Sequence, residues 1–364
     1  MRGKAGPVDF GILITILLLL GIGLIMVFSA SALTSSYEFK DSLYYLKRQL
    51  VWAGIGLGVM FLALQWEYTR WRRLAFPLLG FTLLSLVLVL LIGSKAGESS
   101  RWLGWGGIKF QPSEMAKFTL VVFMAASLDR HQKRLVSFWQ GVAPYLVLLA
   151  LVGVLILLQP DLGTALAIGA TVYLLLAVGG ARPDHLAFLA AAALGAVALA
   201  IKAAPYRMAR FTAFLNPWAD PHGFGWQTIQ SLLAIGSGGL LGTGLGFGRQ
   251  KLYYLPENHT DFIFSVLSEE LGFLGAGLVV VLFLILIWRG FRVAFKAPDN
   301  FARLLAAGLT IMLAVQVLIN MGMTTGLLPV TGIPLPLLSY GGSSLLFTLL
   351  SLGVLLNISR YVKA

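Results

Sequence analysis

The sequence contains no cysteine and few charged residues. The absence of cysteine among the 364 residues excludes disulfide bonds, thiolate nucleophiles and cysteine-bound metal. Its four histidines are scattered without the spacing of metal ligands. Charged residues make up 12% of the chain, about half the usual fraction in soluble domains. Most of the surface must therefore face something other than water.

Acidic residues are also scarce, with 15 Asp and Glu against 27 Lys and Arg. No basic patch is interleaved with exposed aromatics on a soluble module, so a nucleic-acid partner is not expected. In a chain that is 58% hydrophobic, a basic excess is typical of membrane topology and contact with anionic lipid. The composition therefore predicts a membrane protein.

Long apolar runs predict an all-α, polytopic fold of about ten transmembrane helices in a single domain covering residues 1–364. A span needs about 20 largely apolar residues, and the first run is too long for the core of a signal peptide. The predicted spans are 10–32, 50–66, 74–93, 114–128, 142–158, 162–178, 185–201, 262–288, 304–323 and 343–358.

The distribution of basic residues predicts cytoplasmic N- and C-termini in the cytoplasmic membrane. Inner segments would then carry Arg2, Lys4, Arg70, Arg72, Arg73, Arg130, Lys133, Arg134, Arg182, Arg289, Arg292, Lys296, Arg303, Arg360 and Lys363. The short outer loops would carry only Lys40, Lys47, Arg48, Lys95, Arg101 and Lys109.

A long outer loop, about 202–260, separates the seventh and eighth spans. It shows no obvious secondary structure, and a loop of this length is usually functional or disordered. Its aromatic residues argue against disorder and for packing onto the membrane surface. Its glycine-rich stretch, 236–248, lacks the Lys-Ser/Thr and the βαβ context of a phosphate loop, so tight loop packing is expected.

Two polar motifs lie at the starts of the fourth and sixth spans. Glu114 and Lys117 are three residues apart on one helix face, and they suit either a structural ion pair or the wall of a polar cavity. Asp161, in Gln159–Thr164, suits either a helix cap or a carboxylate that binds a divalent metal or a substrate hydroxyl.

A third motif runs from Tyr254 to Gly272, where the outer loop re-enters the membrane. Asp261 suits a helix cap, or a general base whose affinity for protons is raised at the membrane edge. Glu257 and His259 precede it and are candidate substrate-binding residues. Glu269 and Glu270 follow about two turns into the span, too deep for both to be caps, so at least one needs a partner.

The last motif, 328–344, carries no charge and three prolines. It is therefore expected to re-enter the membrane, which is tolerated only against protein or a wet cavity. Ser339 and Tyr340 offer hydrogen-bond donors to a sugar or a phosphate.

These motifs resemble those of the SEDS family of peptidoglycan glycosyltransferases, FtsW, RodA and SpoVE, over nearly the whole chain. The strongest matches are His259–Phe264, Glu269–Gly272 and Leu338–Ser344. Within the family, 26–31 and 206–218 favour the FtsW and SpoVE type, used in cell division, although 333–336 leans towards RodA, which serves cell shape.

The resemblance implies that lipid II is polymerised outside the cytoplasmic membrane beside a class B penicillin-binding protein. It implies that Asp261 is the catalytic residue and that Glu114, Lys117 and Asp161 belong to the site.

Joining sugars with inversion, by displacement of a lipid pyrophosphate, needs a base, charge for the leaving group and a groove for the lipid. Asp261 is the candidate base. The leaving group would be neutralised by Arg101, Lys109, Arg207, Arg210, Lys251 or a divalent cation. No organic cofactor is expected; Mg²⁺ or Mn²⁺ is the candidate cation, with Asp161 and Asp261 as its candidate ligands.

Two other functions are compatible with the same residues. A lipid II flippase would use a polar cavity containing Glu114 and Lys117 equally well. A non-catalytic scaffold for the transpeptidase would need complex formation but not Asp261. The carboxylates of the long outer loop favour the enzyme.

Overall fold

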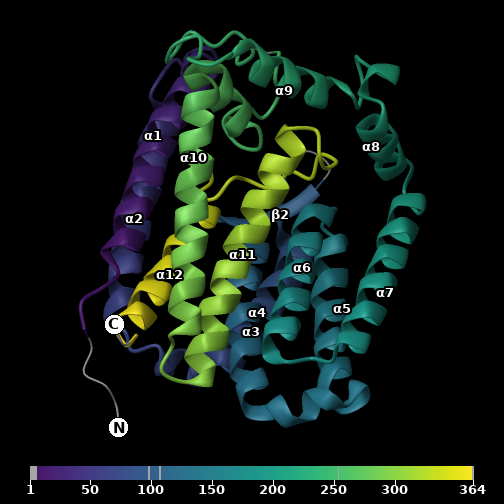
Figure 1. Ribbon diagram of the computed structural model, residues 1–364. Helices are drawn as coiled ribbons and strands as arrows, with labels where there is room; N and C mark the ends of the chain where they lie inside the picture. Colours follow the sequence, from purple (N-terminus) through teal and green to yellow (C-terminus); the bar gives the residue numbers. More distant parts are fainter. Residues whose placement is uncertain (1–5, 97–98, 106–107, 253, 363–364) are drawn as a thin grey trace.

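The computed structural model describes residues 6–96, 99–105, 108–252 and 254–362, and it is almost entirely helical (Figure 1). The long helices are α1 (Phe10–Phe39), α2 (Tyr44–Gln65), α3 (Thr69–Ile92), α4 (Pro112–His131), α5 (Ala143–Leu157), α6 (Leu162–Gly179), α7 (Pro183–Lys202), α10 (Ile263–Phe295), α11 (Asn300–Thr324) and α12 (Gly342–Ser359). Both termini lie at one end of the bundle, and α8 and α9 lie at the other (Figure 1).

Nine helices in the described part of the chain are long and apolar enough to cross a membrane. The exception among the long helices is α4, which carries Glu114, Lys117, Asp129 and Arg130. It is nevertheless largely buried and packs on α3 and α11. A polytopic bundle with about ten spans is therefore confirmed, and the ends of the predicted spans lie within a few residues of most observed helices.

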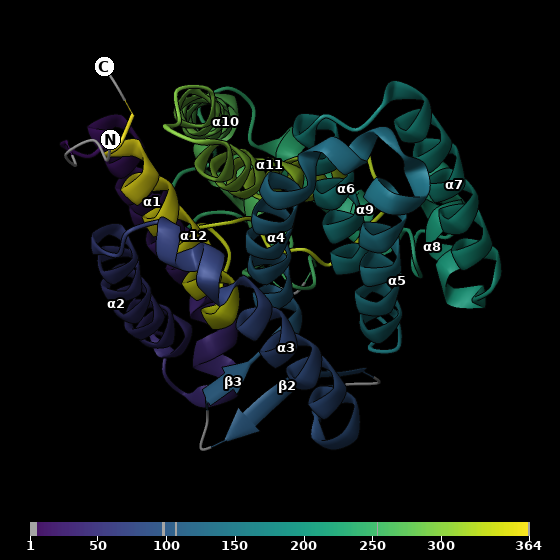
Figure 2. The same cartoon turned by 90° about the horizontal axis from the view of Figure 1, so that it is seen from below.

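Burial differs strongly between the helices. The most apolar stretches of α11 and α12 are 78% buried, whereas Leu189 is the one buried residue in α7. Seen along the bundle, α4 and α11 occupy the interior and α7 stands at the edge (Figure 2). Most apolar side chains of α7 therefore face outwards, and the protein core lies between the other helices.

The expectation that 202–260 lacks regular structure was wrong. The segment contains α8 (Pro205–Leu215), the short 3₁₀ helix η3 (Pro217–Ala219) and α9 (Trp226–Ser237). Pro205 occupies the first turn of α8, where its missing N–H costs nothing. Trp226 donates from Nε1 to the carbonyl of Tyr254 at 2.7 Å, so an aromatic side chain ties α9 to the end of the loop.

A small antiparallel sheet between α3 and α4 was also not expected. It consists of β1 (Ser94–Ala96), β2 (Ser99–Trp105) and β3 (Ile108–Phe110), in the order β1-β2-β3. Leu103 pairs with Phe110 across β2 and β3. The sheet brings Arg101 of β2 to the connection between α5 and α6.

Helix α10 is broken at Gly272, whose φ of 67° and ψ of −168° are not helical. The N–H groups released beyond the break donate to the glycine-rich stretch, from Phe273 to the carbonyl of Gly239 at 2.8 Å and from Leu274 to that of Leu240 at 3.2 Å. This geometry confirms the expected tight packing of the glycine-rich stretch. It also divides α10 into a short outer piece, 263–271, and a long spanning piece.

The segment between α11 and α12 enters the bundle, as its lack of charge predicted. Ile333, Leu335 and Leu338 are fully buried. The segment reaches Gly23, midway along α1, where an added Cβ would lie only 2.3 Å from the carbonyl oxygen of Leu337. We call residues 325–341 the re-entrant segment.

Candidate active site

A cavity of about 550 Å³ lies at the end of the bundle that carries α8 and α9. Its wall is formed by β2, the starts of α4 and α6, the last part of α7, α8, the residues before α10 and the re-entrant segment. Ionisable side chains from several of these elements converge on it: Arg101, Glu114, Asp161, Arg207, Arg210, Glu257 and Asp261. Both signs of charge therefore meet in one space.

Three arginines form the basic part of the wall, and they differ in their partners. Arg101 donates from Nε to the carbonyl of Gln159 at 3.0 Å and from Nη2 to that of Pro160. Arg207 donates from Nε to the hydroxyl of Tyr206 at 2.9 Å. The Arg210 side chain has neither a hydrogen bond nor an ion pair with any residue that the structure describes. Arg210 is therefore free to bind an anion.

Asp261 faces the cavity from the last turn before α10. Burial raises the pKa of its carboxyl to about 7, and the negative charges of Glu257 and Asp161 act in the same direction. Arg101 and Arg210 oppose the shift. A carboxylate whose pKa lies near neutrality suits a general base, because a large fraction of it is ionised at neutral pH and it still binds a proton well.

Asp161 caps a helix and also faces the cavity. It caps α6, since its Oδ1 accepts from the N–H of Thr164 at 3.0 Å and its Oδ2 accepts from the hydroxyl at 2.9 Å. It also lines the cavity. The cap fixes the orientation of a carboxylate that still contributes its charge to the cavity.

Glu114 and Lys117 combine the two alternatives that the sequence left open. They form an ion pair of 2.8 Å with both side chains 5% exposed. Glu114 lines the cavity, while Lys117 lies deeper, between α4 and α6. The negative charge that Glu114 brings to the cavity wall is thus compensated by the positive charge of Lys117 behind it.

The backbone around Asp261 is held by the re-entrant segment and α11. Asn320 of α11 donates from Nδ2 to the carbonyl of Asp261 at 2.8 Å and to that of Ile333 at 2.7 Å. Ser339 donates from its hydroxyl to the carbonyl of Thr260, and Tyr340 donates its N–H to the carbonyl of His259 at 2.9 Å. These bonds position Asp261 from behind.

Four residues expected to contact substrate do not line the cavity. The hydroxyl of Ser339 is used by Thr260, as described above, and also accepts from the N–H of Leu335 at 2.8 Å. Lys109 has an exposed side chain outside the cavity wall. Lys251 is buried in an ion pair with Glu270. The structure thus places these three side chains outside the cavity. Their positions in the sequence did not show in which direction the side chains point.

The fourth is His259, which packs between aromatic rings. Its ring lies 4.5 Å from that of Tyr45 and 5.7 Å from that of Tyr340, centroid to centroid. Burial lowers the pKa of His259, so the ring is neutral at neutral pH. Tyr340 and Glu257, the remaining expected residues, do line the cavity.

Sequence reasoning missed two buried amides that organise the site. Gln49 of α2 donates from Nε2 to the carbonyl of Ser339 at 3.1 Å and accepts from the N–H of Gly341 at 3.3 Å. Asn320 has the role described above. Asn320 lies within an apolar helix, and its presence there was the available signal. Gln49 follows two basic residues at the start of α2, so its position in the sequence carried no such signal.

A divalent cation fits the cavity only together with a substrate. Among the residues that the structure describes, no three His, Asp or Glu side chains gather as metal ligands. Asp161 and Asp261 face the same cavity, and Mg²⁺ is commonly bound by one or two carboxylates, several waters and substrate phosphates. The two carboxylates therefore suit a cation that arrives with a phosphorylated substrate.

Comparison with known proteins decides the family. The family model described as "Cell cycle protein", which covers FtsW, RodA and SpoVE, matches residues 10–364. The chain belongs to this family. It is 48% identical over 365 residues to stage V sporulation protein E of Bacillus subtilis, with 100% of both chains covered. It is 45% identical to a probable peptidoglycan glycosyltransferase FtsW of Geobacter metallireducens, covering 98% of this chain and 95% of the relative.

Solved structures of the family share the fold. A chain described under "Structural coordination of polymerization and crosslinking by a peptidoglycan synthase complex" has a TM-score of 0.80 and 35% identity, covering 97% of this chain and 98% of that one. The rod shape determining protein RodA of Thermus thermophilus has a TM-score of 0.73 and 33% identity, with 97% of each covered. The higher identities to SpoVE and FtsW agree with the subgroup that the motifs favoured.

Proposed function

We propose that this protein is a peptidoglycan glycosyltransferase that polymerises lipid II into glycan strands on the outer face of the cytoplasmic membrane. The names of its relatives support glycosyltransferase activity. The observation that carries the proposal is the presence of Asp261, a carboxylate with a pKa of about 7, in one cavity with Arg210, which has no partner among the described residues.

In the proposed reaction, Asp261 accepts the proton of the sugar 4-hydroxyl as that oxygen attacks the anomeric carbon of the donor. The new C–O bond forms on the face of the anomeric carbon opposite its bond to undecaprenyl pyrophosphate. That bond breaks, and the pyrophosphate leaves with both bonding electrons. Inversion follows from this single displacement. Arg210, with Arg207 and Arg101 nearby, stabilises the negative charge of the leaving pyrophosphate.

A bound Mg²⁺ or Mn²⁺ would supply additional positive charge for the pyrophosphate. Asp161 is the residue best placed to hold it, because its carboxylate is already oriented by Thr164 and faces the cavity. Asp261 is the second candidate ligand, and phosphate oxygens of the substrate would complete the coordination.

The proposal includes a class B penicillin-binding protein as partner and cytoplasmic termini. The related chain from a peptidoglycan synthase complex, in which polymerisation is coordinated with crosslinking, supports such a partner. The two termini lie at the opposite end of the bundle from α8 and α9 (Figure 1). Cytoplasmic termini would therefore place the cavity on the outer side, where the growing wall is.

The test is polymerisation of purified lipid II by Asp261→Asn in liposomes containing the transpeptidase partner. Loss of the base is expected to reduce the rate by about 10²- to 10⁴-fold. The control is Asp184→Asn, which removes an acid from an exposed ion pair at the other end of the bundle and should leave the rate unchanged. Glycan length is measured on gels, with Mg²⁺ and with EDTA.

The outcomes separate the alternative functions. A flippase would move labelled lipid II across the bilayer without lengthening it, and a scaffold would leave product formation independent of Asp261. Full polymerisation by a folded Asp261→Asn variant would contradict the proposed base. An unchanged rate in EDTA would exclude an essential divalent cation.

A further inference from the structure

The short outer piece of α10 ends in two buried acidic residues. Glu269 and Glu270 are 2% and 1% exposed, and they lie immediately before the break at Gly272. The carboxyl end of a helix carries a partial negative charge, so two carboxylates there are electrostatically unfavourable unless other groups compensate them. Two buried carboxylates at the end of a helix therefore require partners that compensate their charge.

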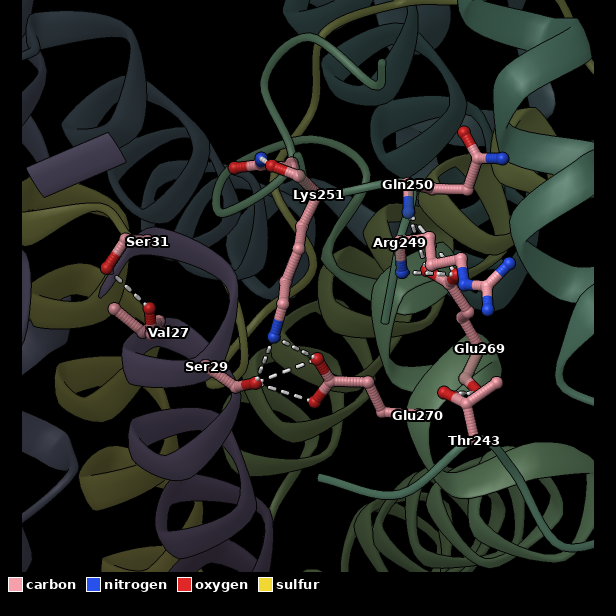
Figure 3. Close-up of polar contacts among 10 residues, drawn as sticks. Val27, Ser29, Ser31, Thr243, Arg249, Gln250, Lys251, Glu269 and Glu270 are labelled. Atoms are coloured by element: carbon pink, nitrogen blue, oxygen red, sulfur yellow. Dashed lines mark hydrogen bonds and ion pairs between the residues drawn. The ribbon is translucent and has the colours of Figure 1, made fainter. Parts of the chain in front are cut away.

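Both carboxylates have specific partners (Figure 3). Glu270 Oε1 lies 2.6 Å from Lys251 Nζ, and the hydroxyl of Ser29 donates to Glu270 Oε2 at 2.6 Å. Lys251 Nζ also donates to the Ser29 hydroxyl at 3.1 Å. We call Ser29, Lys251 and Glu270 the charge clamp. It joins three separate segments: α1, the loop before Asp261 and the outer piece of α10.

Glu269 strengthens the same junction. Its Oε1 accepts from the N–H of Arg249 at 2.7 Å, and Gln250 donates its N–H to the same carboxylate at 3.2 Å. The loop is thus bound through three consecutive residues, 249–251. The clamp is sensitive to loss of one member, because removing one charge of a buried pair leaves the other without compensation.

The clamp is connected to Asp261 from both sides. Asn258 donates from Nδ2 to the carbonyl of Lys251 at 3.1 Å, and its Oδ1 lies 3.0 Å from Nδ1 of His259, two residues before Asp261. On the other side, the outer piece of α10 begins at Ile263, two residues after Asp261. Since the break at Gly272 frees this piece from the direction of the spanning piece, its orientation must be set by its own contacts.

We infer that Ser29, Lys251 and Glu270 are positioning residues, which fix the outer piece of α10 against α1 and thereby hold the Asp261 carboxylate in its place in the cavity. The inference rests on the proposed function, in which Asp261 is the base. None of the three lines the cavity, so they act through Asp261 and do not touch substrate.

The experiment compares Lys251→Met, Glu270→Gln and Ser29→Ala in the full-length protein, reconstituted with its partner. The matched control is Arg289→Met, which breaks an ion pair of 2.7 Å with Asp9. This pair also joins α1 to α10, but at the end of the two helices that lies away from the clamp. Lys251→Met and Glu270→Gln are expected to lower kcat for lipid II polymerisation by about 10- to 100-fold, since small displacements of a reacting group have effects of this size. KM should change by less than about threefold, which corresponds to a change in binding free energy of about 0.6 kcal/mol at most.

Thermal unfolding distinguishes positioning from general stability. The Tm of Lys251→Met and of Glu270→Gln is compared with that of Arg289→Met, and kcat is normalised to the folded fraction of each preparation. A positioning role lowers the normalised kcat in the clamp variants but not in Arg289→Met.

Two variants guard against loss of folding. Ser29→Ala removes only one hydroxyl and should lower kcat by a smaller factor, and Lys251→Arg should recover part of the kcat lost in Lys251→Met. If the wild type does not polymerise lipid II, the proposed function fails. If the wild type is active and the folded clamp variants match Arg289→Met in normalised kcat, the positioning inference is overturned.

Discussion

At the scale of single residues, the proposed base could be named from the sequence, but most of the residues that hold it in place could not. Asp261 and Arg101 stand out because polar motifs interrupt apolar sequence. Lys251 was assigned to the leaving group, since a basic residue in a loop next to the site could face either the cavity or a buried acid. Only the folded positions of Glu270 and Ser29 decide between these directions.

The raised pKa of Asp261 also predicts an effect on stability. Its ordinary pKa is 3.8 and its folded value is about 7, so between these pH values the folded protein binds more protons than the unfolded chain. Stability should therefore fall as pH rises through this window and remain lower above it. Asp261→Asn removes the charge, and its Tm should exceed that of the wild type at pH 8.

The measurement is thermal unfolding in detergent at pH 8 and pH 5, with Asp184→Asn as the exposed control. The increase in Tm of Asp261→Asn over the wild type should be smaller at pH 5, because at that pH ionisation of the wild-type carboxyl destabilises the folded protein less. An equal gain at both pH values would contradict a titrating Asp261 and indicate a packing effect.

At the scale of elements, hydrophobic runs located the spans, and packing determined the rest. Helices α8 and α9 were missed because a scan for long apolar runs ignores short amphipathic helices. The three- and four-residue spacing of Ile229, Leu232 and Leu233 on α9 was the available signal. The re-entrant segment was predictable from its lack of charge, but its contact with α1 depends on a single glycine far away in the sequence.

That contact predicts a difference between two glycines on the same helix. A Cβ at Gly23 would overlap the carbonyl of Leu337, whereas a Cβ at Gly21 would meet nothing within 4 Å. Gly23→Ala should cost about 1–3 kcal/mol through overpacking and displace the segment that supports Asp261. Gly21→Ala should be neutral or stabilise by up to about 1 kcal/mol, because alanine favours helix.

Thermal unfolding and lipid II polymerisation of the two variants check this difference. Gly23→Ala should lose both stability and activity, while Gly21→Ala retains both. Equal behaviour of the two glycine variants would mean that the re-entrant segment does not depend on close contact with α1.

At the scale of the whole molecule, the bundle has two unlike ends. One end carries α8, α9 and the cavity, and the other carries both termini (Figure 1). Composition predicted the membrane and the approximate number of spans, because each helix must be apolar over its length. The small burial of α7 was not predictable, since its apolar sequence is the same whether it faces protein or lipid.

The absence of cysteine makes the orientation directly testable. Lys133→Cys, on the segment after α4, should react with a membrane-impermeant thiol reagent only after the cells are opened. Asp220→Cys, between α8 and α9, should react in intact spheroplasts. The opposite pattern would place the termini outside and contradict the proposed function, because the cavity would then open to the cytoplasm.

The break at Gly272 separates the direction of the outer piece of α10 from that of the spanning piece. A span responds to bilayer thickness by tilting, and an unbroken α10 would transmit any tilt to the residue just before it. The spanning piece can therefore tilt while the outer piece keeps the orientation set by its own contacts. We expect deformation of the surrounding membrane to have less effect on the position of Asp261.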